Sequence, residues 1–281
     1  MLMVTQLSGF GSGFSGGSRL YDVILNLGLT TGLQLCLDSG DSLSYTSGQS
    51  WLDRSGNGYD FFLGADGSAT ATDPTFAGAV GDQSAYWSFD GGDYFRYDST
   101  NEAWMNRLHQ NNAIFTIVSF CFPAIPNGVP ATNRTLLATN GGHVSSPAIG
   151  IGVDPDGNIR VSNGPSSPAN VLSASPTSKA NDLAWNMTGI SLDEASGAGG
   201  SFCYLNGAYN QVSGSDTFNG TYTSPSASDA SYKMEICARG NALLPVGSGT
   251  RLSCLAIWDG IILTKVNMDS IWDAMRGRFG L

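Results

Sequence analysis

The carboxylates are the first residues whose types and spacing could do chemistry. Hydrolysis of a glycosidic bond needs two carboxyl groups, about 5–5.5 Å apart for retention or about 6.5–9.5 Å apart for inversion. Alternate residues of one strand could supply them, because positions i and i+2 share a face. Asp154 and Asp156 have that spacing but lie in a turn-forming run, Glu235 has no carboxylate two or four positions on, and Asp193 and Glu194 are adjacent. The sequence therefore predicts a non-enzymatic protein, with no catalytic residue assigned.

The same turn, Asp154 to Asn158, carries oxygen-bearing side chains at alternate positions, which suits calcium. An EF-hand loop needs glycine at its sixth position and a bidentate glutamate at its twelfth, whereas here glycine is fourth and Pro165 is twelfth. A hairpin turn is therefore favoured. No cofactor is assigned from this turn.

Nucleophile and metal patterns are weak. His109 and His143 lie in polar segments without a serine or cysteine partner, which predicts surface histidines. The five cysteines include no CxxC pair and lie in apolar runs, as in Leu35-Cys36-Leu37. Buried thiols are expected in place of zinc ligands, with disulfides as the alternative.

Aromatic residues give the better indication of binding, because planar rings beside amide and carboxylate groups hold sugar faces and protein hot spots. The candidate ligand-binding residues lie in or next to Gly/Asn-rich turns and are Trp51, Asp53, Asn57, Tyr59, Trp104 and Tyr209. The alternative is that Trp51 and Trp104 cap the ends of the core. The tryptophans in strand or helix patterns, Trp87, Trp185, Trp258 and Trp272, are predicted to be core residues.

Composition indicates which elements position these residues. The 281-residue chain is 13% charged, contains 37 glycines, and has very little of the Glu and Lys that cover exposed helices. An all-β fold with many turns is expected. The net charge of -10 argues against nucleic acid as a partner. No apolar run approaches the roughly 20 residues of a membrane span, and residues 1–17 lack a signal-peptide pattern, so neither membrane insertion nor a standard secretion signal is expected.

Short apolar runs separated by turn residues predict many antiparallel strands. The predicted strands are 33–37, 85–89, 94–97, 115–122, 134–138, 148–153, 158–162, 185–192, 201–205, 233–238 and 251–258. Two hairpins are predicted, one around the Asp154 to Asn158 turn and one around Asn206-Gly207. Apolar spacing predicts one amphipathic helix, from Val266 to Arg276.

The N-terminal segment differs from the rest of the chain. Its first twenty residues are rich in glycine and serine and carry Phe10 and Phe14. Such a segment cannot bury enough surface to order itself, so either a disordered tail or an arm that orders on a partner is expected. We expect an arm over 1–32 and one sandwich over 33–281.

Several fragments, in order, resemble the laminin-G-like jelly-roll domains of the concanavalin-A-like lectin/glucanase superfamily. They are WLDRSGNGY at 51–59, SAYWSFDGGDYFRY at 84–97, AIFTIVSFCF at 113–122, the two hairpins, and the closing run from 251 to 280. The resemblance implies a two-sheet antiparallel sandwich with a short C-terminal helix. Some laminin-G-like domains hold calcium at a sandwich rim, so the resemblance leaves Asp38, Asp41 and Asp53 open as calcium ligands, although no spacing selects them. The superfamily's glucanases use an E-x-D-x-E strand, which this chain lacks.

The Gly-rich start also resembles structural proteins of tailed bacteriophages. That resemblance implies a virion protein, a decoration, collar or fibre component anchored to other virion proteins through its arm. A carbohydrate-binding adhesin or lectin with an extracellular location is the alternative, and a glycoside hydrolase is the third. Host surface glycans and a homo-oligomer remain open as partners.

Overall fold

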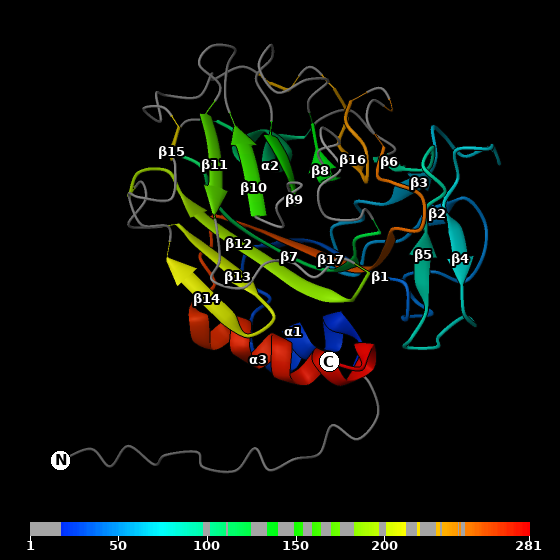
Figure 1. Ribbon diagram of the computed structural model, residues 1–281, viewed down its shortest axis with the longest axis horizontal. Coiled ribbons are helices and arrows are strands. Elements are labelled where there is room, and N and C mark those ends of the chain that lie inside the picture. Colours follow the sequence, from blue (N-terminus) through cyan, green and yellow to red (C-terminus); the bar gives the residue numbers. More distant parts are fainter. Residues whose placement is uncertain are drawn as a thin grey trace.

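The computed structural model describes residues 18–97, 102–110, 112–124, 134–139, 149–153, 159–163, 170–174, 183–196, 201–211, 218–219, 229–230, 232–240, 242 and 245–281. Within this part of the chain, two antiparallel sheets pack face to face, and helices cover the outer face of one of them (Figure 1). The expected sandwich and its C-terminal helix are confirmed. Residues 1–17, which include Phe10 and Phe14, lie outside the described residues.

Sheet A carries the strands nearest the helices. Its strands are β1 (Leu33–Asp38), β4 (Thr75–Ala77), β5 (Tyr86–Ser88), β7 (Ile114–Phe122), β12 (Asn186–Asp193), β13 (Phe202–Leu205), β14 (Ala208–Gln211) and β17 (Arg251–Asp259). Their order is β14-β13-β12-β7-β17-β5-β4, and β1 pairs with β17 as well. Strand β17 is therefore flanked by β7 on one edge and by β1 and β5 on the other.

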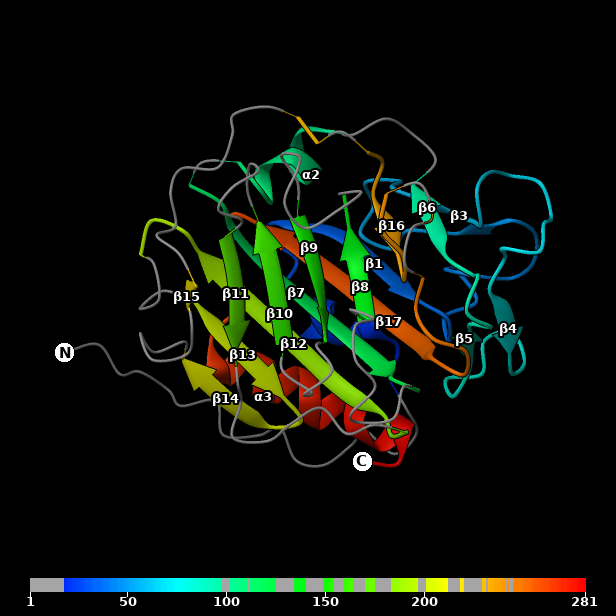
Figure 2. The same cartoon turned by 45° about the horizontal axis from the view of Figure 1, so that its top comes forward.

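Sheet B lies across the other face of sheet A (Figure 2). Its strands are β2 (Ser50–Trp51), β3 (Phe61–Leu63), β6 (Phe95–Tyr97), β8 (Arg134–Ala138), β9 (Ile149–Val153), β10 (Ile159–Asn163), β11 (Asn170–Ala174), β15 (Phe218–Asn219) and β16 (Glu235–Ile236). They follow the order β15-β11-β10-β9-β8-β16-β6-β3-β2.

Both predicted hairpins are present. Strands β9 and β10 pair with Val153 opposite Ile159, and their connecting turn lies outside the described residues. Strands β13 and β14 pair with Leu205 opposite Ala208. Between them Asn206 and Gly207 both have positive φ, at 48° and 87°, which is the backbone a two-residue type I′ turn requires.

The helices are α1 (Leu20–Asn26), α2 (Ala103–Arg107) and α3 (Lys265–Met275), followed by the 3-10 turn η2 (Arg276–Phe279). Thr264 starts α3 with a capping box, because its hydroxyl accepts from the Asn267 N–H while the Asn267 side chain accepts from the Thr264 N–H. The predicted helix was expected to stop at Gly277. Instead the chain stays helical through η2, and Gly280 takes the left-handed conformation that ends it.

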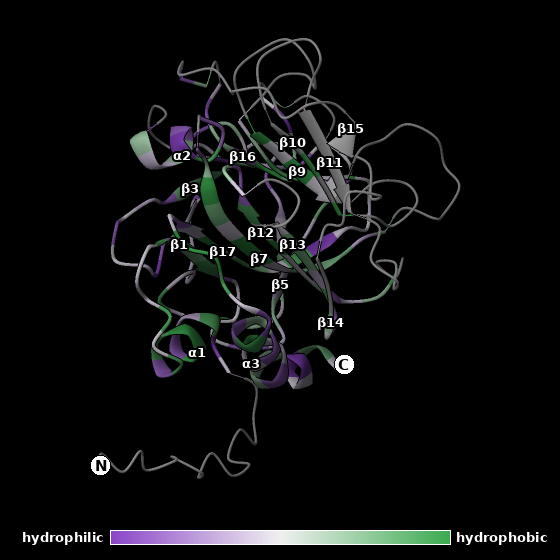
Figure 3. Cartoon of the chain, turned by 90° about the vertical axis from the view of Figure 1, so that its left-hand side faces the viewer, coloured by the Kyte–Doolittle hydropathy of each residue, from purple (hydrophilic) through white to green (hydrophobic). Residues whose placement is uncertain are grey.

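Two cores result, one on each face of sheet A. Figure 3 shows sheet B, sheet A and the pair α1 and α3 as three successive layers. The core between the sheets contains Trp51, Trp87 and Phe95, and the core under the helices contains Trp258 and Ile271. The central strands of sheet A, β7, β12 and β17, are thus buried on both faces, which explains their continuous apolar sequences.

Helix α1 changes the expected boundary of the N-terminal arm. Its apolar side chains Leu20, Val23 and Ile24 follow helical spacing and are buried in the core beneath sheet A. Residues 18–32, assigned to the arm from their position next to the Gly/Ser-rich start, are therefore a packed part of the body.

Candidate functional site

The predicted ligand-binding segment begins with Trp51, which is 0% exposed. Its ring lies against Trp87 and Phe95, with centroid distances of 5.8 and 4.9 Å. Strand β2 places it there because Trp51 pairs with Phe61 of β3, and both side chains point between the sheets. The ring has no surface to offer a ligand, so Trp51 belongs to the core.

Asp53 and Asn57 tie the following turn to strand β1. One Asp53 oxygen accepts from the N–H of Cys36 at 2.9 Å and from the N–H of Ser55 at 2.8 Å. The Asn57 amide donates to the carbonyls of Leu33 and Gln34 at 3.1 and 3.0 Å. These bonds satisfy the backbone of β1 on the side away from β17, so the geometry gives both residues a structural role.

Tyr59 and Trp104 do meet. Their rings stack with centroids 5.0 Å apart and planes 23° apart, and Trp104 is 2% exposed whereas Tyr59 is half-buried. Burial and the nearby Glu102 carboxylate raise the pKa of Tyr59. Tyr209 lies in β14 opposite Tyr204, and its side chain is outside the described part. Among the predicted ligand-binding residues whose side chains the structure describes, Tyr59 is thus the one aromatic residue with a partly exposed ring.

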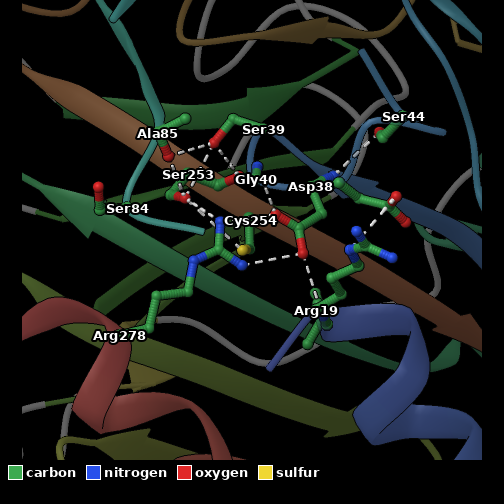
Figure 4. A network of polar contacts seen from close by, with 12 residues as sticks. Arg19, Asp38, Ser39, Gly40, Ser44, Ser84, Ala85, Ser253, Cys254 and Arg278 are labelled. Atoms are coloured by element: carbon green, nitrogen blue, oxygen red, sulfur yellow. Dashed lines mark hydrogen bonds and ion pairs between the residues drawn. The ribbon is translucent and has the colours of Figure 1, made fainter. Parts of the chain in front are cut away.

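The proposed calcium ligands Asp38 and Asp41 are occupied by arginines (Figure 4). Arg278 donates to both oxygens of Asp38, and Arg54 donates to Asp41 at 2.7 Å. All three carboxylates that were left open for calcium, including Asp53, therefore serve hydrogen bonds within the fold. Among the described residues, no group of three His, Cys, Asp or Glu side chains is arranged to hold a metal ion.

The other carboxylates considered for catalysis are also engaged. Glu235, 1% exposed, accepts from the guanidinium of Arg96 at 2.7 Å and from the Ala242 N–H. Asp193 accepts from the Ser196 hydroxyl at 2.7 Å, and Glu194 accepts from the Ala113 N–H at 3.0 Å. Asp154 and Asp156 lie outside the described residues.

His109 and the cysteines are buried. His109, expected at the surface, is 0% exposed because the turn after α2 directs it inward together with Leu108; His143 is not among the described residues. All five cysteines are buried, as the apolar runs predicted. Burial raises the pKa of the Cys36, Cys237 and Cys254 thiols, which keeps them neutral and weakly nucleophilic.

A small cavity of about 40 Å³ lies between the two sheets, near Cys121, Ile151 and Leu252. Its lining is mostly aliphatic. A space with so few polar groups offers little to fix the orientation of a polar ligand such as a sugar.

The sequence analysis missed a surface cluster of four aromatic side chains around one arginine, here called the Arg251 cluster. Its members are Tyr86, Phe122, Trp185, Arg251 and Phe279, and each is half-buried. The Trp185 ring lies 4.8 Å from Phe279 and 5.9 Å from both Tyr86 and Phe122. Trp185, predicted to be a core residue, therefore lies at the surface.

Strand pairing explains why residues so distant in sequence meet. Strands β12 and β17 both run antiparallel to β7, so their first residues lie beside its last. Arg251 is opposite Phe122 of β7 on one side and opposite Ser88 of β5 on the other. Tyr86 is on the same face of β5 as Ser88. Their neighbours Trp87, Cys121 and Leu252 point between the sheets, which turns the cluster toward the helix-bearing face.

The guanidinium carbon of Arg251 lies 4.5 Å from the centroid of Phe122 and 4.8 Å from that of Tyr86. Both distances are within the range of cation–π attraction. The cluster thus combines aromatic rings with a positive charge on a partly open surface. A signal was present in the sequence, because strand alternation places Tyr86, Phe122 and Arg251 opposite apolar core positions.

Comparison with known proteins supports the fold. No model of a protein family matches the chain, and no curated protein matches it either. Among solved structures, domain 4 of AbnA, a GH43 arabinanase from Geobacillus stearothermophilus solved with arabinotriose, matches with a TM-score of 0.52 and 19% identity. That match covers 86% of this chain and 97% of the domain.

Two larger proteins match as well. Trypanosoma rangeli sialidase in complex with sialic acid has a TM-score of 0.51 and 17% identity over 86% of this chain, which spans only 33% of the sialidase. The binding domain of botulinum neurotoxin serotype G has a TM-score of 0.50 and 12% identity, over 85% of this chain and 50% of that one. No described helix is long and apolar enough to cross a membrane. At these identities the likeness shows the fold alone, which is a lectin-like β-sandwich.

Proposed function

We propose that this protein is a non-enzymatic, lectin-like module that binds a glycan at the Arg251 cluster. The observation that carries the proposal is the group of half-buried rings around Arg251 at one end of sheet A. Aromatic rings stack against the C–H faces of sugars, and a guanidinium supplies several hydrogen-bond donors beside them. The Asn57 and Tyr59 turn offers less, since its polar groups are already used within the fold.

The comparisons are consistent with this proposal. The arabinanase domain, nearly all of which is covered by the match, was solved with an oligosaccharide bound. The fold is therefore compatible with sugar binding by a module without a second domain. The likeness is to the fold, and it assigns no sugar to this chain.

A hydrolase is the less supported alternative. Glycosidic cleavage needs one carboxyl group to give a proton and a second to act as base or nucleophile. Asp38, Asp41 and Glu235 are held by arginines. These carboxylates are thus already engaged within the fold, and no two of them are placed to flank a sugar bond.

Binding to a glycan array tests the proposed function. We expect Trp185→Ala to lower the affinity for any bound glycan by about five- to tenfold, since stacking on one ring contributes on the order of 1–1.5 kcal/mol. Trp272→Ala is the matched control, because this α3 residue is also half-buried, packs beside Gly207, and takes part in none of the ring contacts of the cluster. Equal loss in both variants, or no glycan bound by the wild type, would contradict the proposal.

We also propose that the module is displayed on a tailed-phage virion, of the laminin-G-like kind, through residues 1–17. The supporting observation is that the chain joins the body at a fixed point. The Asp38 carboxylate accepts from the N–H of Leu20 at 2.8 Å, and Arg278 lies 3.5 Å from the Ser18 carbonyl. An extracellular lectin is the alternative location.

Deletion of residues 1–17 tests this display. The body is expected to keep its thermal unfolding midpoint while incorporation into particles is lost. Deletion of 1–20 is the informative comparison, since it also removes the buried Leu20 and should destabilise the fold. Unchanged incorporation of the 1–17 deletion would contradict the display role and leave glycan binding untouched.

A further inference from the structure

The Arg251 guanidinium differs from other arginines in the described part of the chain. Six other described arginines lie within ion-pair distance of a carboxylate: Arg19, Arg54, Arg96, Arg107, Arg276 and Arg278. No described carboxylate pairs with Arg251, whose described side-chain contacts are the rings of Tyr86 and Phe122. Its charge is therefore available.

The donors of Arg251 also reach solvent. The residue is half-buried, but none of its side-chain nitrogens is buried without a hydrogen-bond partner. Two rings hold the guanidinium at 4.5 and 4.8 Å, which restricts its rotation and removes water from its neighbourhood. A guanidinium fixed in this way is suited to bind a carboxylate through two parallel hydrogen bonds.

The site is local and not a general anion-binding surface. The chain has a net charge of -10, so a polyanion would be repelled by most of the molecule. A ligand with one carboxylate on a sugar ring, by contrast, could place the acid on Arg251 and a ring face on Trp185. The neighbouring aromatic rings lower the local dielectric and so strengthen the ion pair.

We propose that the ligand of the Arg251 cluster is an acidic glycan, one in which a sugar ring carries a carboxylate that pairs with Arg251. This inference rests on the proposed glycan-binding function and specifies its ligand class. Trp185 then contributes affinity for the ring, while Arg251 contributes the preference for acid over neutral sugars.

The test uses the full chain and an array in which each carboxylated glycan is printed beside its methyl ester, which keeps the ring and linkage but removes the charge. At least one acid should bind, and its ester should bind at least about tenfold more weakly, because the charged hydrogen bonds are lost. Binding of the acid should also weaken between 0.05 and 0.5 M salt, on the order of the screening expected for a partly exposed pair.

Variants assign the preference to Arg251. Arg251→Met should bring the acid to the level of its ester, and Arg251→Lys should keep part of the preference because it retains charge without the planar fork. Arg276→Met is the control, since Arg276 is an exposed arginine outside the cluster. Thermal unfolding and near-ultraviolet circular dichroism establish that the variants are folded.

The outcomes separate the inference from the function on which it rests. Equal binding of acid and ester, or an acid preference that survives in folded Arg251→Met, overturns the acidic-glycan inference while leaving Trp185-dependent binding intact. Binding to no glycan at all overturns both. Binding that appears only after residues 1–17 are deleted would assign the cluster to that segment and overturn the inference for the full chain.

Discussion

The side chains of Asp38 and Arg278 form a two-pronged ion pair that is completely buried. Nη1 of Arg278 lies 2.9 Å from one carboxylate oxygen and Nη2 lies 2.6 Å from the other, across a sequence separation of 240 residues. The same carboxylate accepts from the N–H groups of Leu20 and Gly40, and Nη2 also contacts the Ser253 hydroxyl at 2.9 Å. This network, drawn in Figure 4, joins α1, β1, β17 and η2.

Arg278→Met should therefore destabilise the fold strongly. Removing one partner leaves a buried carboxylate without its main counter-charge, which typically costs about 3–5 kcal/mol. Equilibrium unfolding in urea measures this loss. Arg276→Met is the matched control, because its ion pair with Asp273 is exposed, and it should change the free energy of unfolding by less than about 0.5 kcal/mol. Similar effects of the two substitutions would contradict the central role of the buried pair.

Gly40→Ala should disturb the same network by a steric route. A Cβ at residue 40 would lie 2.8 Å from the Cα of Gln83 and would clash with Nη2 of Arg278. Because backbone lies on one side and a held guanidinium on the other, we expect a loss of about 1–3 kcal/mol in urea unfolding. Gly277→Ala is the control, because a Cβ at residue 277 would have no atom within 4 Å and the backbone there does not have a positive φ. This substitution should be neutral or slightly stabilising. A neutral Gly40→Ala would show that this contact relaxes freely.

Asp93 should make the folded state more stable at low pH than at neutral pH. Burial and the nearby Asp90 carboxylate raise the Asp93 pKa from its ordinary 3.8 to about 6. The folded state therefore binds the proton more tightly than the unfolded state does. This contribution is fully present below about pH 3.8 and is lost as the pH rises through about 6.

Asp93→Asn removes the titration and keeps an oxygen that can accept from the Asp90 N–H. In a series of urea unfolding curves from pH 4 to 7, the wild type should lose stability relative to Asp93→Asn as the pH rises. A constant difference between the two proteins across that range would contradict the raised pKa.

Trp51→Ala is expected to act on stability, not selectively on ligand binding. The ring is fully buried against Trp87 and Phe95, so its removal should cost about 3–5 kcal/mol. The neighbouring Leu52→Ala, at a side chain 39% exposed, should cost about 1 kcal/mol or less in the same unfolding measurement. A stable Trp51→Ala that had lost glycan binding would restore this residue to the ligand site.

The long strands of sheet A could be predicted closely. Ile114–Phe122 and Arg251–Asp259 differ from the predicted ranges by one residue at one end, because continuous apolar runs bounded by turn residues identify strands buried on both faces. The short strands β2, β3 and β4 were missed. Two or three residues are too few to show alternation, and their pairing is set by neighbouring strands.

Strand alternation marks single members of the Arg251 cluster as facing away from the core, but their grouping could not be predicted because they are distant in sequence. Tyr86, Trp185 and Phe279 meet only after β5, β12 and η2 have been placed by sheet pairing and by α3 packing. Trp51 and Trp104 were binding candidates with a core role as the alternative, and both rings lie in the core. Each is flanked by polar turn residues, which local composition associates with surface, whereas the tertiary fold directs both rings inward.

The position of β17 in sheet A has a consequence for how the chain folds during synthesis. Strand β1 pairs only with β17 among the described strands, and β7 has β17 along one whole edge. During translation the first strand must therefore wait for residues 251–259 to leave the ribosome. Strand β7 and the cysteine-bearing apolar runs would meanwhile have an unprotected edge. Completion of sheet A accordingly awaits the synthesis of β17, and exposure to aggregation or chaperones falls in the interval before β17 is inserted.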